Sequence, residues 1–259
     1  MELIDTHCHL TSSRFADDRD AVFARAHAAG LAGCISIGTG VADAREALAL
    51  APLHPRLAVC AGIDPFSAHE LGPAFNDELQ ALTQLVRDAP VVAIGECGLD
   101  YHYQLDPPRM QQAHTVAQLE LAREHELPVV LHVREAHADM IALLREHPGS
   151  RGVIHSFTAG PAEAADYLAL GWHLAFNGIM TYKNAPTVRA AAAMVAADRL
   201  LLETDAPFLA PVPQRSRRCE PAHLVHTAEQ CARVRGETVE QIARCTTANA
   251  RRLFALPTA

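Results

Sequence analysis

The chain has 259 residues, of which 49% are hydrophobic and 20% charged, and its formal net charge is −8. These values predict one globular domain over residues 1–259, and the negative charge argues against a broad nucleic-acid-binding surface, which depends on releasing counterions from phosphates. No apolar run approaches the roughly 18 residues that a membrane span needs, and the N-terminus lacks a secretory signal pattern. We therefore expect a soluble, monomeric, cytoplasmic protein with reduced cysteines, none of which forms a CxxC pair.

Short β-branched or apolar runs alternate along the chain with stretches of helical spacing, which is the pattern of repeated βα units. Eight runs predict strands over residues 3–9, 33–38, 57–63, 91–96, 128–133, 152–157, 173–178 and 200–204. Helices are predicted near residues 17–29, 41–50, 76–88, 108–126, 135–147, 161–170, 185–196 and 221–235. Residues 237–259 continue with helical sequence, which we expect to pack on the outside. Eight pairs in a chain of this length predict a (β/α)8 TIM barrel, and the absence of GxGxxG after the first strand disfavours a dinucleotide-binding sheet.

The active site of such a barrel lies at the carboxyl ends of its strands. The first strand ends in His7-Cys8-His9, and its two imidazoles share one face because alternate strand residues do. Imidazoles and carboxylates at the ends of five predicted strands form a set of ligands that suits divalent metals. The set is His7, His9, Glu96, His132, His155 and Asp205. Six candidates exceed the three or four ligands of one ion, so the pattern predicts two divalent ions, with Mg, Mn, Zn, Ni and Fe as the choices.

Each of these residues also has an ordinary structural explanation. An isolated histidine is more often a hydrogen-bonded interior residue, Glu96 can form an ion pair at the barrel mouth, and Asp205 can cap the segment that follows it. Their joint placement at strand ends favours the metal site. The only lysine, Lys183, follows the seventh predicted strand, so no carbamylated lysine can bridge two metals from the fourth strand. If the site is binuclear, Glu96 is the bridging ligand.

Five segments, in this order and spacing, resemble the TatD family of metal-dependent hydrolases within the amidohydrolase-like barrels. They are DTHCHL, AIGECGLDYHY, PVVLHVREAH, GVIHSFTAG and RLLLETDAPFLAPVP, and the resemblance extends from residue 4 to about residue 254. It implies a metal-dependent deoxyribonuclease activity and assigns metal binding to the same six residues. Two positions depart from the family pattern. Asp64 stands where relatives usually have a histidine, and the segment from Arg217 to Pro221, which includes Cys219, lacks the asparagine that they commonly carry before the proline.

We therefore predict a 3'-5' exodeoxyribonuclease or phosphodiesterase that acts on single-stranded or frayed DNA, or on RNA, through a water activated by two metals. Asp205 and Glu96 are the predicted catalytic residues, with Asp205 accepting the proton of the water. Glu203 is expected to orient a histidine ligand. Substrate contacts are predicted for Lys183, Arg134, Tyr101, Arg217 and Arg218, together with Arg215, His102 and Tyr103. The alternative is an ester or amide hydrolase such as an aminoacyl-tRNA deacylase, in which Asp64 binds an amino group. A non-catalytic scaffold would need a missing ligand, and none is missing.

Overall fold

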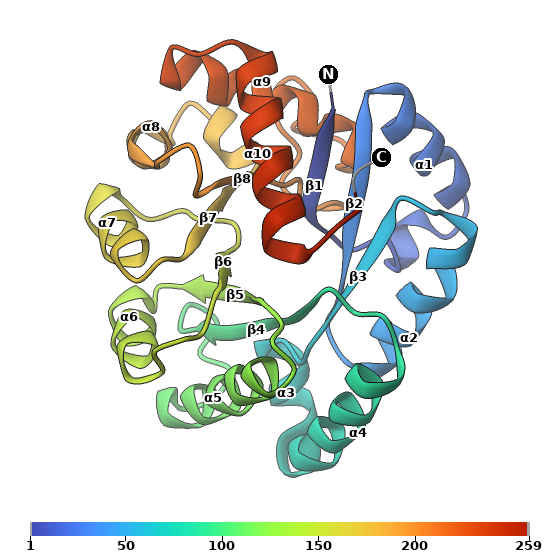
Figure 1. The fold of residues 1–259 in the computed structure, drawn as a ribbon, viewed down its shortest axis with the longest axis vertical. Helices are drawn as coiled ribbons and strands as arrows, with labels where there is room; N and C mark the ends of the chain where they lie inside the picture. Colours follow the sequence, from blue (N-terminus) through green and yellow to red (C-terminus); the bar gives the residue numbers. More distant parts are fainter. Residues whose placement is uncertain (1, 258–259) are drawn as a thin grey trace.

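A computed structural model describes residues 2–257. Eight parallel strands follow one another around a barrel, each hydrogen-bonded to the next in chain order (Figure 1). A bridge between Cys8 and Ala206 links the first and last strands, so the barrel is nearly closed. The predicted (β/α)8 TIM barrel is confirmed. The strands are β1 (Leu3–Cys8), β2 (Leu31–Gly38), β3 (Leu57–Ala61), β4 (Ala93–Asp100), β5 (Val129–Arg134), β6 (Gly152–Ile154), β7 (His173–Phe176) and β8 (Leu200–Leu202).

The helices surround the strands, and each predicted helix is present with small shifts of its ends. They are α1 (Arg19–Ala28), α2 (Val41–Leu50), α3 (Pro65–Leu71), α4 (Phe75–Asp88), α5 (Pro108–Glu124), α6 (His137–Glu146), α7 (Pro161–Ala169), α8 (Pro186–Met194), α9 (Leu224–Arg235) and α10 (Val239–Phe254). Single 3-10 turns occupy Ser13–Phe15, Ala51–Leu53, Gly72–Ala74, Gly178–Thr181 and Pro221–His223. The short helix α3 was not predicted. It begins after Asp64, whose side chain accepts a hydrogen bond from the Ser67 N–H as an N-cap. No helix within residues 2–257 is long and apolar enough to span a membrane.

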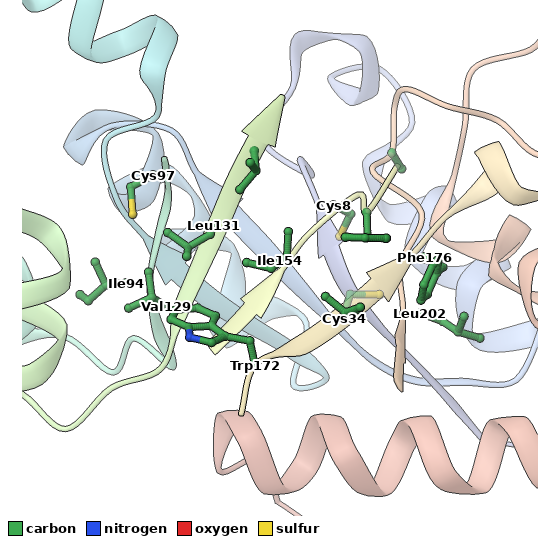
Figure 2. Close-up of a cluster of buried hydrophobic side chains, with 14 of the residues drawn as sticks. Cys8, Cys34, Ile94, Cys97, Val129, Leu131, Ile154, Trp172, Phe176 and Leu202 are labelled. Carbon is green, nitrogen blue, oxygen red and sulfur yellow. The ribbon is translucent and has the colours of Figure 1, made fainter. Parts of the chain in front are cut away.

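The core has two layers that the strands separate. The outer layer lies between strands and helices, and Figure 2 shows Cys8, Leu131, Trp172 and other members of it. The inner layer takes residues from all eight strands, from Ile4 in β1 to Leu201 in β8. Successive strand residues alternate between the two faces, and both layers are apolar, so most strands are nearly continuous hydrophobic runs, while β1 and β4 also carry polar residues. This explains why the strands were visible in the sequence as apolar runs.

The position of α10 corrects the expectation that the C-terminal tail packs on the outside. Figure 1 shows α10 lying across the barrel and not in the ring of helices. Its residues Ala250, Leu253 and Phe254 belong to the inner layer together with Ile4 and Leu201. The apolar face of this amphipathic helix therefore closes the barrel interior at the end opposite the site described below, which leaves only the carboxyl ends of the strands open.

Two irregular strands place the polar residues. In β1, Ile4 belongs to the inner layer, and strict alternation would put Thr6 and Cys8 on the same face. A register shift between Asp5 and Cys8 accompanies a change of face, so that His7 and His9 point inward instead. In β4, the strand runs on to Asp100 and does not end at Glu96 as predicted. Gly98, with φ of 143°, lies so close to β5 that a Cβ atom would lie 2.0 Å from the carbonyl oxygen of His132. Only glycine permits this approach.

Candidate metal centre and cleft

The carboxyl ends of the strands surround a cleft of about 800 Å³. Every strand, or the loop that follows it, contributes side chains to its lining. The six residues predicted from the strand ends meet at its floor, and five of them line the cleft. His7, the sixth, is fully buried beneath it. This is the end of the barrel where the active site was predicted.

One set of ligand atoms comes from β1 and the segment after β8, and we call it the His7 group: His7, His9 and Asp205. The Nε2 atoms of His7 and His9 are 3.3 Å apart. Oδ1 of Asp205 lies 3.7 Å from Nε2 of His7 and 3.4 Å from Nε2 of His9. Asp205 itself adopts φ of 60°, a left-handed conformation that aspartate tolerates better than most residues, and its N–H donates to the carbonyl of His7 at 2.9 Å. The segment after β8 thereby brings the Asp205 carboxylate next to the histidines of β1.

The second set, the His132 group, consists of His132 and His155. Nδ1 of His132 lies 3.4 Å from Nε2 of His155, and both lie near Oε1 of Glu96, at 2.8 Å and 3.0 Å. Oε2 of the same carboxylate lies 3.3 Å from Nε2 of His7. The ligand atom of His7 also lies within 4.8 Å of those of Glu96 and His155, and the His7 ring is stacked on the His155 ring. His7 is assigned to the His7 group because its Nε2 atom faces the Nε2 atom of His9. Glu96 therefore stands between the two groups, with one oxygen toward each.

The donor set fits divalent metal ions. Two nitrogen ligands at about 2.0–2.1 Å from a tetrahedral ion are about 3.3–3.4 Å apart. The nitrogen pair of the His7 group and that of the His132 group match this separation, at 3.3 Å and 3.4 Å. The ligand atoms of His7, His9 and Asp205 lie within 4.8 Å of one another, and so do those of His7, Glu96 and His155. Both groups therefore have the spacing of ligands that share an ion.

The charges of the site favour cations. Burial opposes the negative charge on Glu96, but the neighbouring imidazoles outweigh it and hold the pKa of Glu96 well below its usual range. Burial likewise disfavours the imidazolium of His132, yet hydrogen bonds to Asp100 and Glu96 raise the pKa of His132 to about 9. The pKa of His9 also rises to about 9, because Asp205 outweighs desolvation. The carboxylates therefore favour positive charge at the ring nitrogens, which a divalent ion also supplies.

Glu203 lies beneath the His132 group, where it was expected to orient a histidine. Its Oε1 atom is 3.4 Å from Nδ1 of His155, without hydrogen-bond geometry, and accepts hydrogen bonds from the Ser156 N–H and the Asn177 amide at 2.7 Å and 3.3 Å. Glu203 is 1% exposed. A carboxylate fixed in this way leaves the Nε2 atom of His155 directed at Glu96.

The predicted substrate contacts are distributed unevenly. Arg134 lines the cleft, and so does Tyr103 from the segment Tyr101-His102-Tyr103. Tyr101 instead donates a hydrogen bond to Asp139, and His102 pairs with Glu135. Lys183, Arg215 and Arg217 are exposed but do not line the cleft. Arg218 is held by ion pairs with Asp18 and Glu220. Arg134 is therefore the cation that the structure places at the cleft among the predicted set.

Three cleft residues escaped the sequence reasoning. Asp100 binds Nε2 of His132 at 2.9 Å, and the error in the end of β4 hid it. The aromatic rings of Phe66 and Phe208 stand at the rim, 38% and 50% exposed, and each lies two or three residues after an acid that the sequence did single out. Exposed aromatic side chains beside Asp64 and Asp205 were the available signal.

Comparisons with known proteins agree with this site. Residues 4–255 match the family described as TatD related DNase. The chain is 40% identical to the 3'-5' ssDNA/RNA exonuclease TatD of Erwinia amylovora, covering 98% of this chain and 100% of that protein. It is 36% identical to the uncharacterized metal-dependent hydrolase YcfH of Escherichia coli K12, covering 98% of this chain and 96% of that one. The crystal structure of YJJV, a TatD homolog from Escherichia coli K12, matches with a TM-score of 0.91 at 31% identity, with 98% of each chain covered.

The length of the family match, the identity to the relatives and the similarity of the fold all indicate the same family. The histidines and carboxylates gathered at the carboxyl ends of the strands are consistent with it. The chain is a metal-dependent hydrolase with a TIM barrel fold, and it belongs to the TatD-related DNase family.

Proposed function

We propose that the protein is a 3'-5' exonuclease that removes nucleotides from single-stranded or frayed DNA, and from RNA, with the help of two divalent metal ions. The observation that carries this proposal is the position of Glu96, whose two carboxylate oxygens face the His7 group and the His132 group separately. A carboxylate shared in this way is the arrangement expected of a two-metal hydrolytic site, the kind that nucleases, phosphatases and aminopeptidases use. The printed name of the relative from Erwinia amylovora supports the choice of substrate.

The ligands would be divided as the geometry divides them. His7, His9 and Asp205 would hold one ion, His132 and His155 would hold the other, and Glu96 would contact both. Bound ions of this kind polarise the phosphodiester and lower the pKa of a water molecule. Asp205 lines the cleft, and its carboxylate would orient the attacking water and accept its proton.

The rim would hold the substrate. Arg134 supplies a positive charge for a phosphate and lies over the ring of Tyr103, at 4.8 Å from its centroid. The rings of Tyr103 and Phe66 pack edge to face, with their centroids 5.3 Å apart. The ring of Phe208 lies near that of His9, with a centroid distance of 6.1 Å. Exposed rings that stack on bases hold single strands without reading their sequence. A cleft whose lining includes one arginine and no lysine suits the end of a strand better than a long duplex.

One observation favours the second candidate, an aminoacyl-tRNA deacylase or related esterase. The wall of the cleft after β2 and β3 carries Asp43 and Asp64, which would attract an ammonium group and repel a phosphate. The two acids are linked through Thr39, whose N–H donates to Asp43 and whose carbonyl accepts from the Asp64 N–H. The same site could therefore attack a carbonyl ester next to an amino group.

A single assay separates the two. Metal-free protein is reloaded with Mg, Mn or Zn and incubated with 3'-labelled and 5'-labelled single-stranded DNA, the matching duplex, RNA and aminoacyl-tRNA. We expect release of nucleotides from the 3' end of single strands, and loss of that release in H132A and D205N. Arg217, exposed and outside the cleft, provides the control variant R217Q, which should retain activity.

Deacylation by the wild type without DNA or RNA cleavage under any of the three metals would overturn the nuclease proposal. Cleavage from the 5' end alone would overturn the polarity.

A further inference from the structure

Asp100 connects two parts of the site that are otherwise separate. It is the last residue of β4, four positions after Glu96, and it is fully buried. One carboxylate oxygen, Oδ2, lies 2.9 Å from Nε2 of His132. The other, Oδ1, accepts a hydrogen bond from the N–H of Tyr103 at 3.0 Å. The same carboxylate thus touches a metal-site imidazole and the backbone of a rim residue.

The main chain of Asp100 is fixed from the other side. The side chain of Gln111, which is 3% exposed in α5, accepts from the Asp100 N–H at 2.8 Å and donates to the Asp100 carbonyl at 3.0 Å. Gly98 lets this end of β4 lie against His132. With its backbone held on both sides, the Asp100 carboxylate has little freedom to follow either of its partners.

The contact with His132 determines which ring nitrogen is available. Both ring nitrogens of His132 face carboxylates, Nε2 toward Asp100 and Nδ1 toward Glu96. In a neutral ring whose Nδ1 serves as a metal ligand, the proton is on Nε2, where Asp100 accepts it. The lone pair is then on Nδ1, which lies 2.8 Å from Oε1 of Glu96 and 3.4 Å from Nε2 of His155. Asp100 therefore directs the ligand atom of His132 toward the metal centre.

The contact with Tyr103 determines the shape of the rim. The turn that follows β4 is closed by the Asp100 carboxylate, and it presents the Tyr103 ring at the cleft, 52% exposed. There the ring packs against Phe66 and under Arg134. A shift of Asp100 would move this ring together with His132.

We propose that Asp100 is a positioning residue that couples metal binding in the His132 group to substrate binding at Tyr103, an inference that rests on the proposed function. Asparagine at this position offers one acceptor and one amide donor in place of two acceptors, so it can satisfy only one of the two contacts as the wild type does. If the amide donates to Nε2 of His132, the ring proton moves to Nδ1 and the ligand atom is blocked.

The test measures metal binding first, without substrate. Metal-free wild type and D100N are titrated with Zn²⁺ by calorimetry and by metal analysis after dialysis. We expect two equivalents in the wild type. In D100N one equivalent should bind as before and the other about 10- to 100-fold more weakly, as for other residues that orient a metal ligand. In the zinc-loaded wild type, long-range ¹H–¹⁵N spectra should show the His132 proton on Nε2.

Substrate binding supplies the second readout. We expect D100N to raise the KM for single-stranded DNA several-fold even at saturating metal. Y103A should raise the KM while binding both metals as the wild type does, which separates the rim from the metal centre. D100E keeps the charge but displaces the carboxylate by one methylene, so it should show the same selective loss of metal affinity to a smaller degree. If D100N does not fold, D100E replaces it as the test variant.

Equal weakening of both metal equivalents, or wild-type affinity for both in D100N and D100E, would overturn the inference. The metal titration and the spectra need no DNA cleavage. If the wild type cleaves no nucleic acid while D100N still loses one equivalent, it is the proposed function that fails.

Discussion

The N–H of Ser156 donates a 2.7 Å hydrogen bond to Oε1 of Glu203, which joins the residue after His155 to the residue two positions before Asp205. Through this bond a buried carboxylate holds the β6 turn in place, and with it the His155 ring. The contact spans 47 positions of sequence and arises only because β6, β7 and β8 lie side by side.

We predict that E203Q lowers the affinity for one metal ion by about 10- to 100-fold and reduces kcat with it, because the amide retains the packing but not the charge that orients His155. Metal analysis and steady-state kinetics measure both effects. E229Q, a change at an exposed position of α9, is the control. Unchanged metal content with unchanged kcat would show that Glu203 has only a structural role.

Glu96 should control the metal stoichiometry. Because one oxygen of Glu96 faces each group of imidazoles, we expect E96Q to bind at most one tightly held divalent ion and to lose at least 100-fold in kcat. Metal analysis after reconstitution and dialysis measures the first effect. D139N, a change at a carboxylate that bonds Tyr101 outside the cleft lining, should still bind two ions. Two equivalents in E96Q would contradict the bridging role.

Asp64 should weaken the binding of a polyanion. It lies in the cleft, and burial together with Glu96 raises the pKa of Asp64 to about 6, so it is mostly ionised at pH 7. We expect D64N to lower the KM for single-stranded DNA several-fold at low salt, and less at high salt, because a like charge is removed. The asparagine oxygen can still cap α3.

The matched control for D64N is E70Q, which removes the same charge from an exposed position of α3 away from the cleft lining. It should leave the KM unchanged. A higher KM in D64N would mean that Asp64 makes a favourable contact with the substrate.

His173 should make the fold sensitive to acid. Neither of its ring nitrogens has a hydrogen-bond partner among the described residues, and burial together with Arg199 lowers the pKa of His173 to about 4. The unfolded chain, with a pKa near 6.5, then binds more protons than the folded chain between about pH 4 and pH 6.5, so stability falls as the pH drops through this range. The loss from this residue is on the order of 3 kcal/mol.

We expect H173L to flatten this part of the stability curve, as measured by urea unfolding at pH 7, 6, 5 and 4.5. H147L, a change at the half-buried histidine that follows α6, is the comparison and should leave the slope as in the wild type. An H173L curve parallel to that of the wild type would show that His173 does not contribute to acid sensitivity.

Much of the candidate site could be predicted because, in a barrel, a residue at the end of a strand in the sequence lies at a known end of the folded domain. Each strand is apolar on both faces, so a polar residue such as His132 or Glu96 in or just after an apolar run is conspicuous. Parallel strands bring all such residues to one end of the barrel. The barrel and its eight strands were therefore predictable from periodicity, and the convergence of the six candidate ligands at one end of the barrel was predictable from the strand ends.

The contacts that orient these residues were not predictable in the same way. The end of β4 depends on the close approach of Gly98 to β5, which the sequence pattern does not reveal, and the predicted strand therefore stops at Glu96, four residues before Asp100. The pairing of Arg218 with Asp18 and Glu220 joins loops 200 positions apart, and it removes from the cleft a cation that the sequence placed there.

By itself, the sequence determined the barrel and the residue types at its open end, because apolar runs and the residues that end them are local properties of the chain. The tertiary structure alone decided how the ligands divide around Glu96, which of the charged residues reach the cleft, and that α10 closes the opposite end. These are properties of distances between segments far apart in the chain. Such distances are set by the register of neighbouring strands and by the packing of side chains between them.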